Sequence, residues 1–312
     1  MGNNHISMLQ RLLHRGSDRA FRSVTGMTRA EFARLLPAFT QAYADLLAAE
    51  QAQALRRRRP GGGRRGQLPL DAEKLLFILV YVTQYPVQEL QGLLFGLGQS
   101  QASAWALRLL PVLQAALGRE LALPARKTAT LDALKAACPD LVFLLDATER
   151  PIPRPQDPDR QTACYSGKKK RHTLKNTVVA AATGRHIVFV GDTTPGSRHD
   201  KRLAEDDAPP FPPGSRVPSD LGYQGYTVEG ASIITPLKKP RGGELSPDEK
   251  EINTQLSRHR IPVEHAIGGL KVARMLRDPF RNRKDGLADT AIVVAAGLDN
   301  FKCQLRDAAP AN

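Results

Sequence analysis

Three acidic residues are the first candidates for chemistry in this sequence. Asp146 ends the apolar, strand-like run LVFLL, Asp220 ends a second such run, and Glu264 is expected near the start of a later helix. Charged side chains beside apolar strands are costly to bury unless a partner or a metal ion compensates them. Two divalent ions about 3.5–4 Å apart, held by carboxylate oxygens, stabilise the attacking and leaving oxygens when a phosphodiester bond breaks. The three carboxylates could therefore serve phosphodiester chemistry.

Each acid also has a purely structural explanation. Asp146 could cap the loop that follows it, Asp220 could begin the turn before Gly222, and Glu264 could be a surface acid near a helix N-terminus, where the helix dipole favours it. Residue type alone leaves both explanations open, so the elements that position the acids matter.

The second half of the chain has the pattern of an α/β domain. Strands are predicted before Asp146 and before Asp220, and residues 172–194 read as two strands joined at Thr183-Gly184. The run SPDE, with Ser246 as cap and Pro247 at the first helical position, predicts the start of a helix. Strands followed by helices with crossovers indicate an α/β fold with a mixed sheet flanked by helices.

The first half is predicted to be helical. Thr28 is a plausible cap for a helix that ends near residue 54, and residues 70–120 read as a helix, a short helix, a Gly-containing turn and a longer helix beginning near Ser100. This is the order of a helix-turn-helix, in which Gln99, Gln101 and Ser103 would face bases in a major groove. A helical hairpin without contact to DNA is the alternative.

These patterns divide the chain into five expected segments. They are an N-terminal helical segment (1–55), a basic Arg/Gly/Pro linker (56–69), an all-α helix-turn-helix domain (70–120), a connector (121–138) and a catalytic domain (139–307). The linker either contacts DNA or is a solvated hinge.

Charge and composition favour a polyanionic partner. Lys and Arg outnumber Asp and Glu by 45 to 31, a formal net charge of +14, which favours nucleic acid through counterion release. An apolar run of membrane-spanning length and a signal peptide are both missing from the sequence, so we expect a cytoplasmic protein without a membrane partner. Three widely separated cysteines and seven scattered histidines offer no zinc motif. Buried or idle thiols in a reducing cytoplasm are therefore expected.

Six ordered motifs give a more specific indication. They are LLDATERPI, YSGKKKRHTLKN, PGSRHD, SDLGYQGY, LKKPRGGELSPDEKEIN and VEHAIGGLK, spread between about residues 140 and 305. In this order they closely resemble the DDE transposases of bacterial insertion sequences, in particular the group named after insertion sequence five. The helix-turn-helix pattern ahead of them fits the layout of the same family.

The resemblance implies a ribonuclease-H-like catalytic domain in which Asp146, Asp220 and Glu264 are the catalytic, metal-binding carboxylates. The first aspartate would lie on the first strand, the second after the fourth strand, and the glutamate on a helix behind the sheet. The cofactor implied is Mg²⁺, as two ions, with Mn²⁺ as a substitute.

The family also has a Tyr-Arg-Glu-Lys signature around its glutamate. Arg260 and Lys271 match its Arg and Lys, whereas Ser257 occupies the tyrosine position. Lys271 could hold a phosphate or be a solvated lysine. Pro262 predicts either a new helix start or a bend beside Glu264.

A basic loop precedes the second predicted strand. Its cations could clamp the DNA backbone, or they could protect an exposed sheet edge from aggregation; they are Lys168, Lys169, Lys170 and Arg171. His172, His199 and Asp200 match family positions, but the residues themselves suggest no mechanism for them.

The function expected is DNA transposition. The enzyme would bind the terminal inverted repeats of its element, nick the backbone by two-metal hydrolysis and join the 3′-hydroxyl ends to target DNA, as a homodimer in the DNA complex. The alternatives are a domesticated endonuclease of the same fold, a helix-turn-helix regulator with an inactive catalytic domain and, more distantly, a ribonuclease.

Overall fold

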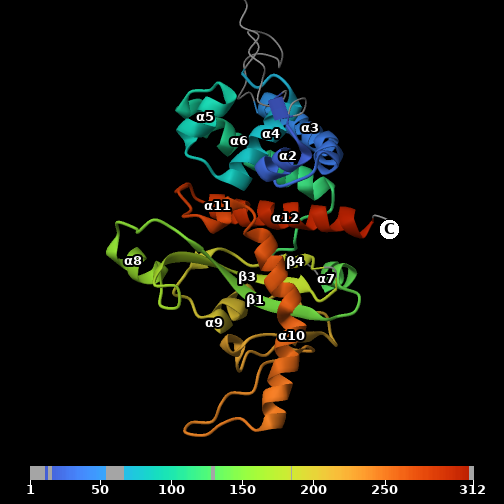
Figure 1. Ribbon diagram of the computed structural model, residues 1–312, viewed down its shortest axis with the longest axis vertical. Coiled ribbons are helices and arrows are strands. Elements are labelled where there is room, and N and C mark those ends of the chain that lie inside the picture. Colours follow the sequence, from blue (N-terminus) through green and yellow to red (C-terminus); the bar gives the residue numbers. More distant parts are fainter. Residues whose placement is uncertain (1–10, 13–15, 54–66, 128–130, 184, 309–312) are drawn as a thin grey trace, which may run out of the picture.

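The computed structural model describes residues 11–12, 16–53, 67–127, 131–183 and 185–308. Figure 1 shows a helical assembly at one end of the molecule and a sheet below it, with α12 lying across the boundary between them. The predicted linker falls largely outside the described residues, as does Gly184 of the predicted turn.

The N-terminal half is helical, as predicted. Thr28 and Glu31 form a capping box at the start of the longest helix of this half, in agreement with the predicted cap. A long, a short and a long helix then follow in the predicted order. The helices of this half are α2 (Asp18–Thr25), α3 (Arg29–Ala52), α4 (Asp71–Gln84), α5 (Gln88–Phe95) and α6 (Gln99–Arg119).

The second half contains a mixed set of strands. The two central strands, β1 and β3, pair antiparallel in continuous register. Strands β4 and β5 pair with β3 on its other side, and β2 pairs with the first two residues of β3. A parallel pair, β6 and β7, continues from β1 through a parallel bridge between Val142 and Arg216. The strands are β1 (Phe143–Pro151), β2 (Tyr165–Ser166), β3 (Arg171–Ala181), β4 (Ile187–Val190), β5 (Thr194–Pro195), β6 (Arg216–Pro218) and β7 (Ser232–Ile234).

Helices surround this sheet. The longest, α10, starts at the predicted cap Ser246 with Pro247 as its first residue, and the structure adds a capping box between Ser246 and Glu249. In Figure 1 it crosses the sheet and extends well beyond it. The helices of this half are α7 (Leu131–Ala137), α8 (Pro158–Cys164), α9 (Asp200–Asp207), the 3₁₀ turn η1 (Leu221–Tyr223), α10 (Pro247–Leu270), α11 (Arg274–Arg277) and α12 (Leu287–Asp307).

Two apolar cores lie on the two faces of the sheet because strand side chains alternate between faces. Leu144 and Val178 belong to the larger core, which also contains buried apolar residues of α2, α3, α4 and α6 and of α10–α12. Phe143 and Leu145 belong to the smaller core, together with Tyr223. The N-terminal helices and one face of the sheet therefore share a single continuous core.

Two local predictions were wrong. Asp146 is not at the end of a strand: it lies inside β1, opposite Val178, because the polar residues after it still pair with β3. Glu264 is not near the start of a helix, because α10 runs from Pro247 through Pro262 to Leu270 without a break. Pro262 removes one hydrogen bond, to the carbonyl of Arg258, and Arg258 is exposed, so water can replace the missing donor.

The thiol prediction is confirmed. Cys138, Cys164 and Cys303 are free and buried. Within the described ranges, no helix combines the length and the apolarity needed to cross a bilayer.

Candidate active site

Asp146 lies on the face of β1 that α10 covers. Successive strand residues point to opposite faces, so Asp146 shares the face of Leu144, which packs into the larger core. Its Oδ2 lies 3.7 Å from Nη2 of Arg260 on α10, and both side chains are largely shielded from solvent. The helix signature residue Arg260 is therefore next to the first aspartate.

Asp220 is brought to the same region from the neighbouring strand. It follows β6, as predicted, and its Oδ1 accepts a hydrogen bond of 2.8 Å from the Gly222 amide at the start of η1. β6 is the fourth strand when the two-residue strands β2 and β5 are left aside. Asp220 therefore does begin the turn before Gly222, and this hydrogen bond fixes the orientation of its carboxylate.

The electrostatics of Asp146 show that acids gather around it. Burial is the main cause that raises its pKa, and the charges of Asp220 and Asp200 raise it further; the Ala147 amide and Arg260 act in the opposite direction. An aspartate with a raised pKa loses part of its preference for the ionised form on folding. A bound cation would restore that preference.

Asp200 is the residue that sequence reasoning left without a role. It is the first residue of α9, and its Oδ1 lies 2.9 Å from Nζ of Lys175, a buried lysine of β3. The same Nζ lies 3.6 Å from Glu149. The signal was in the sequence, because Lys175 lies in a strand that becomes apolar three residues later, at Val178, and a buried lysine needs an acidic partner.

Gly222 separates the carboxylates of Asp200 and Asp220. A Cβ added there would lie 2.9 Å from Oδ1 of Asp220 and 3.1 Å from Oδ2 of Asp200. Both acids therefore face the same small space, which only glycine leaves open.

We predict that Gly222→Ala lowers the phosphodiester cleavage expected from the sequence about tenfold or more, because even a displacement of about 1 Å at a reacting centre can cost about 100-fold in rate. Cleavage rates and thermal unfolding of the variant would be measured together. Gly268→Ala is the matched control, since nothing lies within 4 Å of its added Cβ. Equal cleavage rates in the two variants would contradict the close packing of the two acids.

Two buried polar atoms at this site lack a hydrogen-bond partner. They are the hydroxyl of Tyr223, which is fully buried, and Nε of Arg260. Burial raises the pKa of Tyr223 well above its usual value, and the charges of Asp146, Asp200 and Asp220 add to this. Unpaired buried polar groups are costly, and here they surround the acids, as expected of a site that receives a polar ligand.

Glu264 is not part of this group. It is exposed on α10, one helical turn after Arg260, and its charge is not among the causes of the raised pKa of Asp146. Across the described part of the chain, no three Asp, Glu, His or Cys side chains are grouped closely enough to hold a metal ion. Asp146 and Asp220 are thus brought together, whereas Glu264 is not brought to them.

Lys271 caps the C-terminal end of α10 and is half-buried. Burial lowers its pKa, and so does the charge of Lys169, whereas Asp146 and Glu149 raise it. The basic loop therefore reaches the surroundings of Asp146 through Lys169. The other three cations of this loop are exposed; they are Lys168, Lys170 and Arg171.

The three predicted base-facing residues lie in the first turns of α6. Gln99 and Gln101 are exposed and Ser103 is half-buried. Gln101 Oε1 accepts a hydrogen bond from the Gly98 amide, and Gln99 donates one to Gln88 on α5. Their present contacts hold the turn together, and readout of bases by them stays a prediction.

A sheet that brings two aspartates together against an arginine is the setting of a carboxylate-dependent nuclease. Residues 145–300 match the family described as DDE superfamily endonuclease, and the chain belongs to this family. It is also similar to the probable transposase for insertion sequence element IS702 of Microchaete diplosiphon, with 30% identity over 282 residues, or 90% of this chain and 97% of that protein. The chain is thus placed among the DDE transposases of insertion sequences, and the resemblance seen in the sequence is confirmed. No solved structure matches the chain.

Proposed function

We propose that this chain is the transposase of its own insertion element, binding the terminal inverted repeats, nicking the phosphodiester backbone and joining the 3′-hydroxyl ends to target DNA. The observation that carries the proposal is the convergence of Asp146 and Asp220 beside Arg260, with unpaired buried polar atoms around them. Membership of the DDE transposases supports it.

The donor set fits divalent ions such as Mg²⁺, with Mn²⁺ as a substitute. Carboxylate oxygens are the ligands these ions prefer. Burial, and to a lesser extent the charges of Asp220 and Asp200, raises the pKa of Asp146, and a bound cation would stabilise its ionised form. Asp146 and Asp220 would hold the metal, and Glu264 would join them after a local movement of its side chain or helix. Bound ions supply charge stabilisation at the attacking and leaving oxygens.

The other residues have positioning roles in this proposal. Arg260 keeps Asp146 oriented, Lys175 does the same for Asp200, and Lys271 offers a cation to the phosphate of the strand that is cut. The basic loop at residues 168–171 contacts the DNA backbone, which adds affinity and register but little choice of sequence. We assign recognition of the element's ends to the N-terminal turns of α6.

Two ends must be cut and joined together, so we propose a homodimer in the DNA complex. The same requirement would not apply to an endonuclease that only nicks or to a regulator that only binds.

The proposal is tested on duplexes taken from the DNA that flanks the gene. With Mg²⁺ we expect a single-strand nick at the boundary of an inverted repeat, followed by joining of that 3′ end to a second duplex; EDTA should abolish both steps. Nicking without joining would indicate an endonuclease, and binding without nicking would indicate a regulator.

A further inference from the structure

One cavity lies away from the aspartates, and none of Asp146, Asp200 and Asp220 is among its lining residues. It encloses about 530 Å³ between two walls, one formed by α8 with the segment before it and the other by loop 280–286 with the first turn of α12. Thr193, Thr194 and Pro195, in and beside β5, line the cavity between the two walls. We call this hollow, lined by Arg160, Thr194, Phe280, Arg283 and Ala288 among others, the α8 groove.

Cations dominate the polar lining of the α8 groove. Five Lys or Arg residues line it, namely Arg154, Arg160, Arg281, Arg283 and Lys284, against three carboxylates, Asp157, Asp285 and Asp289. Two of these carboxylates are already occupied: Asp157 caps α8 through the Arg160 amide, and Asp289 accepts hydrogen bonds from Arg126 and Thr193. The lining therefore contains two more cations than carboxylates.

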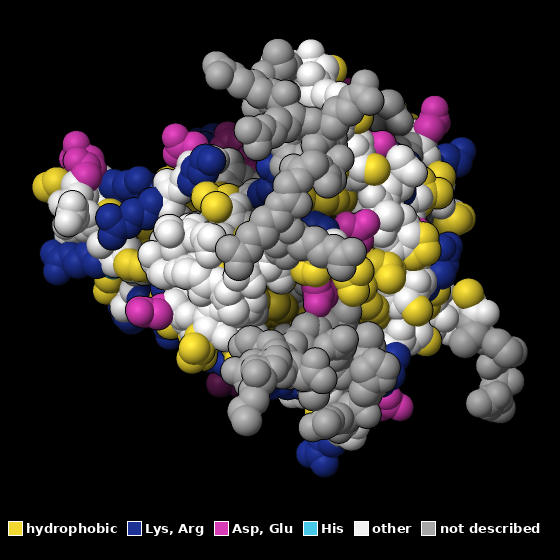
Figure 2. All heavy atoms as spheres, turned by 90° about the horizontal axis from the view of Figure 1, so that it is seen from above, with side chains coloured by type: hydrophobic (Ala, Val, Ile, Leu, Met, Phe, Trp, Pro, Cys, Tyr) yellow, Lys and Arg dark blue, Asp and Glu magenta, His cyan; other side chains and the backbone are white. Residues whose placement is uncertain are grey.

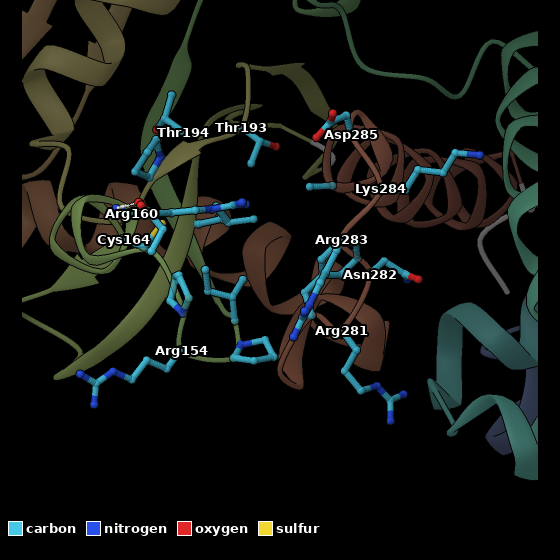
Figure 3. Close-up of a pocket in the computed structure, with 18 of the residues that line it drawn as sticks. Arg154, Arg160, Cys164, Thr193, Thr194, Arg281, Asn282, Arg283, Lys284 and Asp285 are labelled. Atoms are coloured by element: carbon cyan, nitrogen blue, oxygen red, sulfur yellow. Dashed lines mark hydrogen bonds between the residues drawn. The ribbon is translucent and has the colours of Figure 1, made fainter.

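Arg160 and Arg283 are the two cations that face the hollow. In Figure 3 Arg160 extends from the α8 wall toward loop 280–286, and Arg283 turns toward it from that loop, whereas Arg154 and Arg281 point away. Neither Arg160 nor Arg283 has an ion pair with any carboxylate in the described ranges, whereas Arg281 is fixed on the carbonyls of Tyr85 and Pro86. Figure 2 shows Lys and Arg side chains, with some Asp and Glu among them, on the α8 side of the molecule.

β1 leads from the candidate active site to the groove, because Asp146 lies within this strand and the groove lining begins at Ile152, directly after its last residue. Asp146 and Pro151 are five residues apart on β1, about 17 Å at the rise of an extended strand. A duplex advances about 3.4 Å per base pair, so this distance corresponds to about five base pairs. DNA with its scissile phosphate at Asp146 and running along β1 would therefore reach the groove.

We propose that the α8 groove binds the phosphate backbone of the DNA about five base pairs from the bond that is cut, through Arg160 and Arg283. The proposal rests on the proposed function, which supplies DNA as the substrate. Guanidinium groups pair well with phosphate oxygens. The aromatic ring in the lining, Phe280, is only 3% exposed and cannot stack on a base, so the contact is with the backbone and carries no sequence choice.

The test measures how the affinity for a fluorescein-labelled duplex of about 30 base pairs depends on NaCl concentration in EDTA. Each phosphate neutralised adds about 0.9 to the slope of log K against log salt. The double variant R160Q/R283Q is expected to lower the magnitude of this slope by about 1.8. Because both side chains are exposed, the fold should be retained, which thermal unfolding would verify.

The matched control is R185Q/R216Q, which removes two exposed arginines at the opposite end of the sheet. A slope that falls in the groove variant and stays at the wild-type value in the control supports the proposal. An unchanged slope in the groove variant, or an equal fall in both variants, overturns it.

Nicking at saturating DNA and with Mg²⁺ separates this inference from the proposed function. The groove variant is expected to nick at the wild-type rate while needing more DNA to reach half of that rate, since its two arginines lie far from Asp146. A lowered rate at saturation would overturn the backbone role. Wild-type protein that binds no DNA at all would contradict the groove and the proposed function together.

Discussion

Asp146→Asn is expected to lower metal-dependent DNA nicking at least about 1,000-fold, a loss of about 4 kcal/mol in transition-state stabilisation. The change keeps the shape of the side chain but removes the charge that would hold a cation between β1 and β6. Affinity for DNA in EDTA should not fall below the wild-type value, because Asp146 itself repels phosphate. Nicking rates and DNA affinity would be measured on the same preparations.

Asp132→Asn is the matched control for this prediction. Asp132 is an exposed acid in the first turn of α7, a helix that contacts β4, and its charge is not among the causes of the raised pKa of Asp146. Its replacement should change nicking less than about twofold, since surface substitutions away from such features have small effects. If the Asp146 variant kept a tenth of the wild-type rate, Asp146 would not be a metal ligand.

The second large effect concerns stability. Arg150 is 3% exposed, and its guanidinium donates hydrogen bonds to the carbonyl of Ala288 (2.7 Å), to Asn176 (3.1 Å) and to Thr193 (2.7 Å). Arg150→Met would leave these buried acceptors with fewer donors, at about 1–3 kcal/mol for each unsatisfied group. We expect the free energy of unfolding in urea to fall by about 2–4 kcal/mol.

The expected loss is smaller than the full sum because burial also makes the cation costly. Burial lowers the pKa of Arg150 to about 10, and Met would remove that cost. Arg154→Met, at an exposed arginine just beyond the same strand, is the control and should change stability by less than about 0.5 kcal/mol. Equal unfolding midpoints for the two variants would show that Arg150 does not join β1 to α12.

The sequence predicted the elements well where local signals agree. The helix caps at Thr28 and Ser246, the helix order from α4 to α6 and the strand before Asp220 all follow from residue types within a few positions of each other. Local hydrogen bonds decide such features, so a single sequence suffices to find them.

Features that depend on distant partners were missed. The strand around Asp146 extends to Pro151 because β3 pairs with its polar residues, and that pairing has no local signature. The role of Asp200 as the partner of Lys175 joins two segments that are 25 residues apart. Pro262 suggested a break in α10 that packing of Val263 and Ile267 against the larger core prevents.

The candidate site, too, could be predicted only in part from the sequence. Asp146 and Asp220 could be selected from the sequence and are brought together by adjacent strands, whereas the exposure of Glu264 depends on the path of a 24-residue helix over the sheet. The four-residue spacing between Arg260 and Glu264 places them one turn apart on α10, but it does not reveal how the helix crosses the sheet. The two residues therefore differ in burial, with Glu264 exposed and Arg260 partly buried.

The single core shared by the N-terminal helices and the sheet has a consequence for measurement of DNA length. Domains that meet through a large apolar interface do not swing freely, and here Leu109 of α6, Val294 of α12 and Leu144 of β1 belong to one such interior. A sequence held by the start of α6 would therefore lie at a constant separation from Asp146. The number of base pairs between the recognised sequence and the cut would then be a property of the fold, and the protein would act as a ruler on its own element.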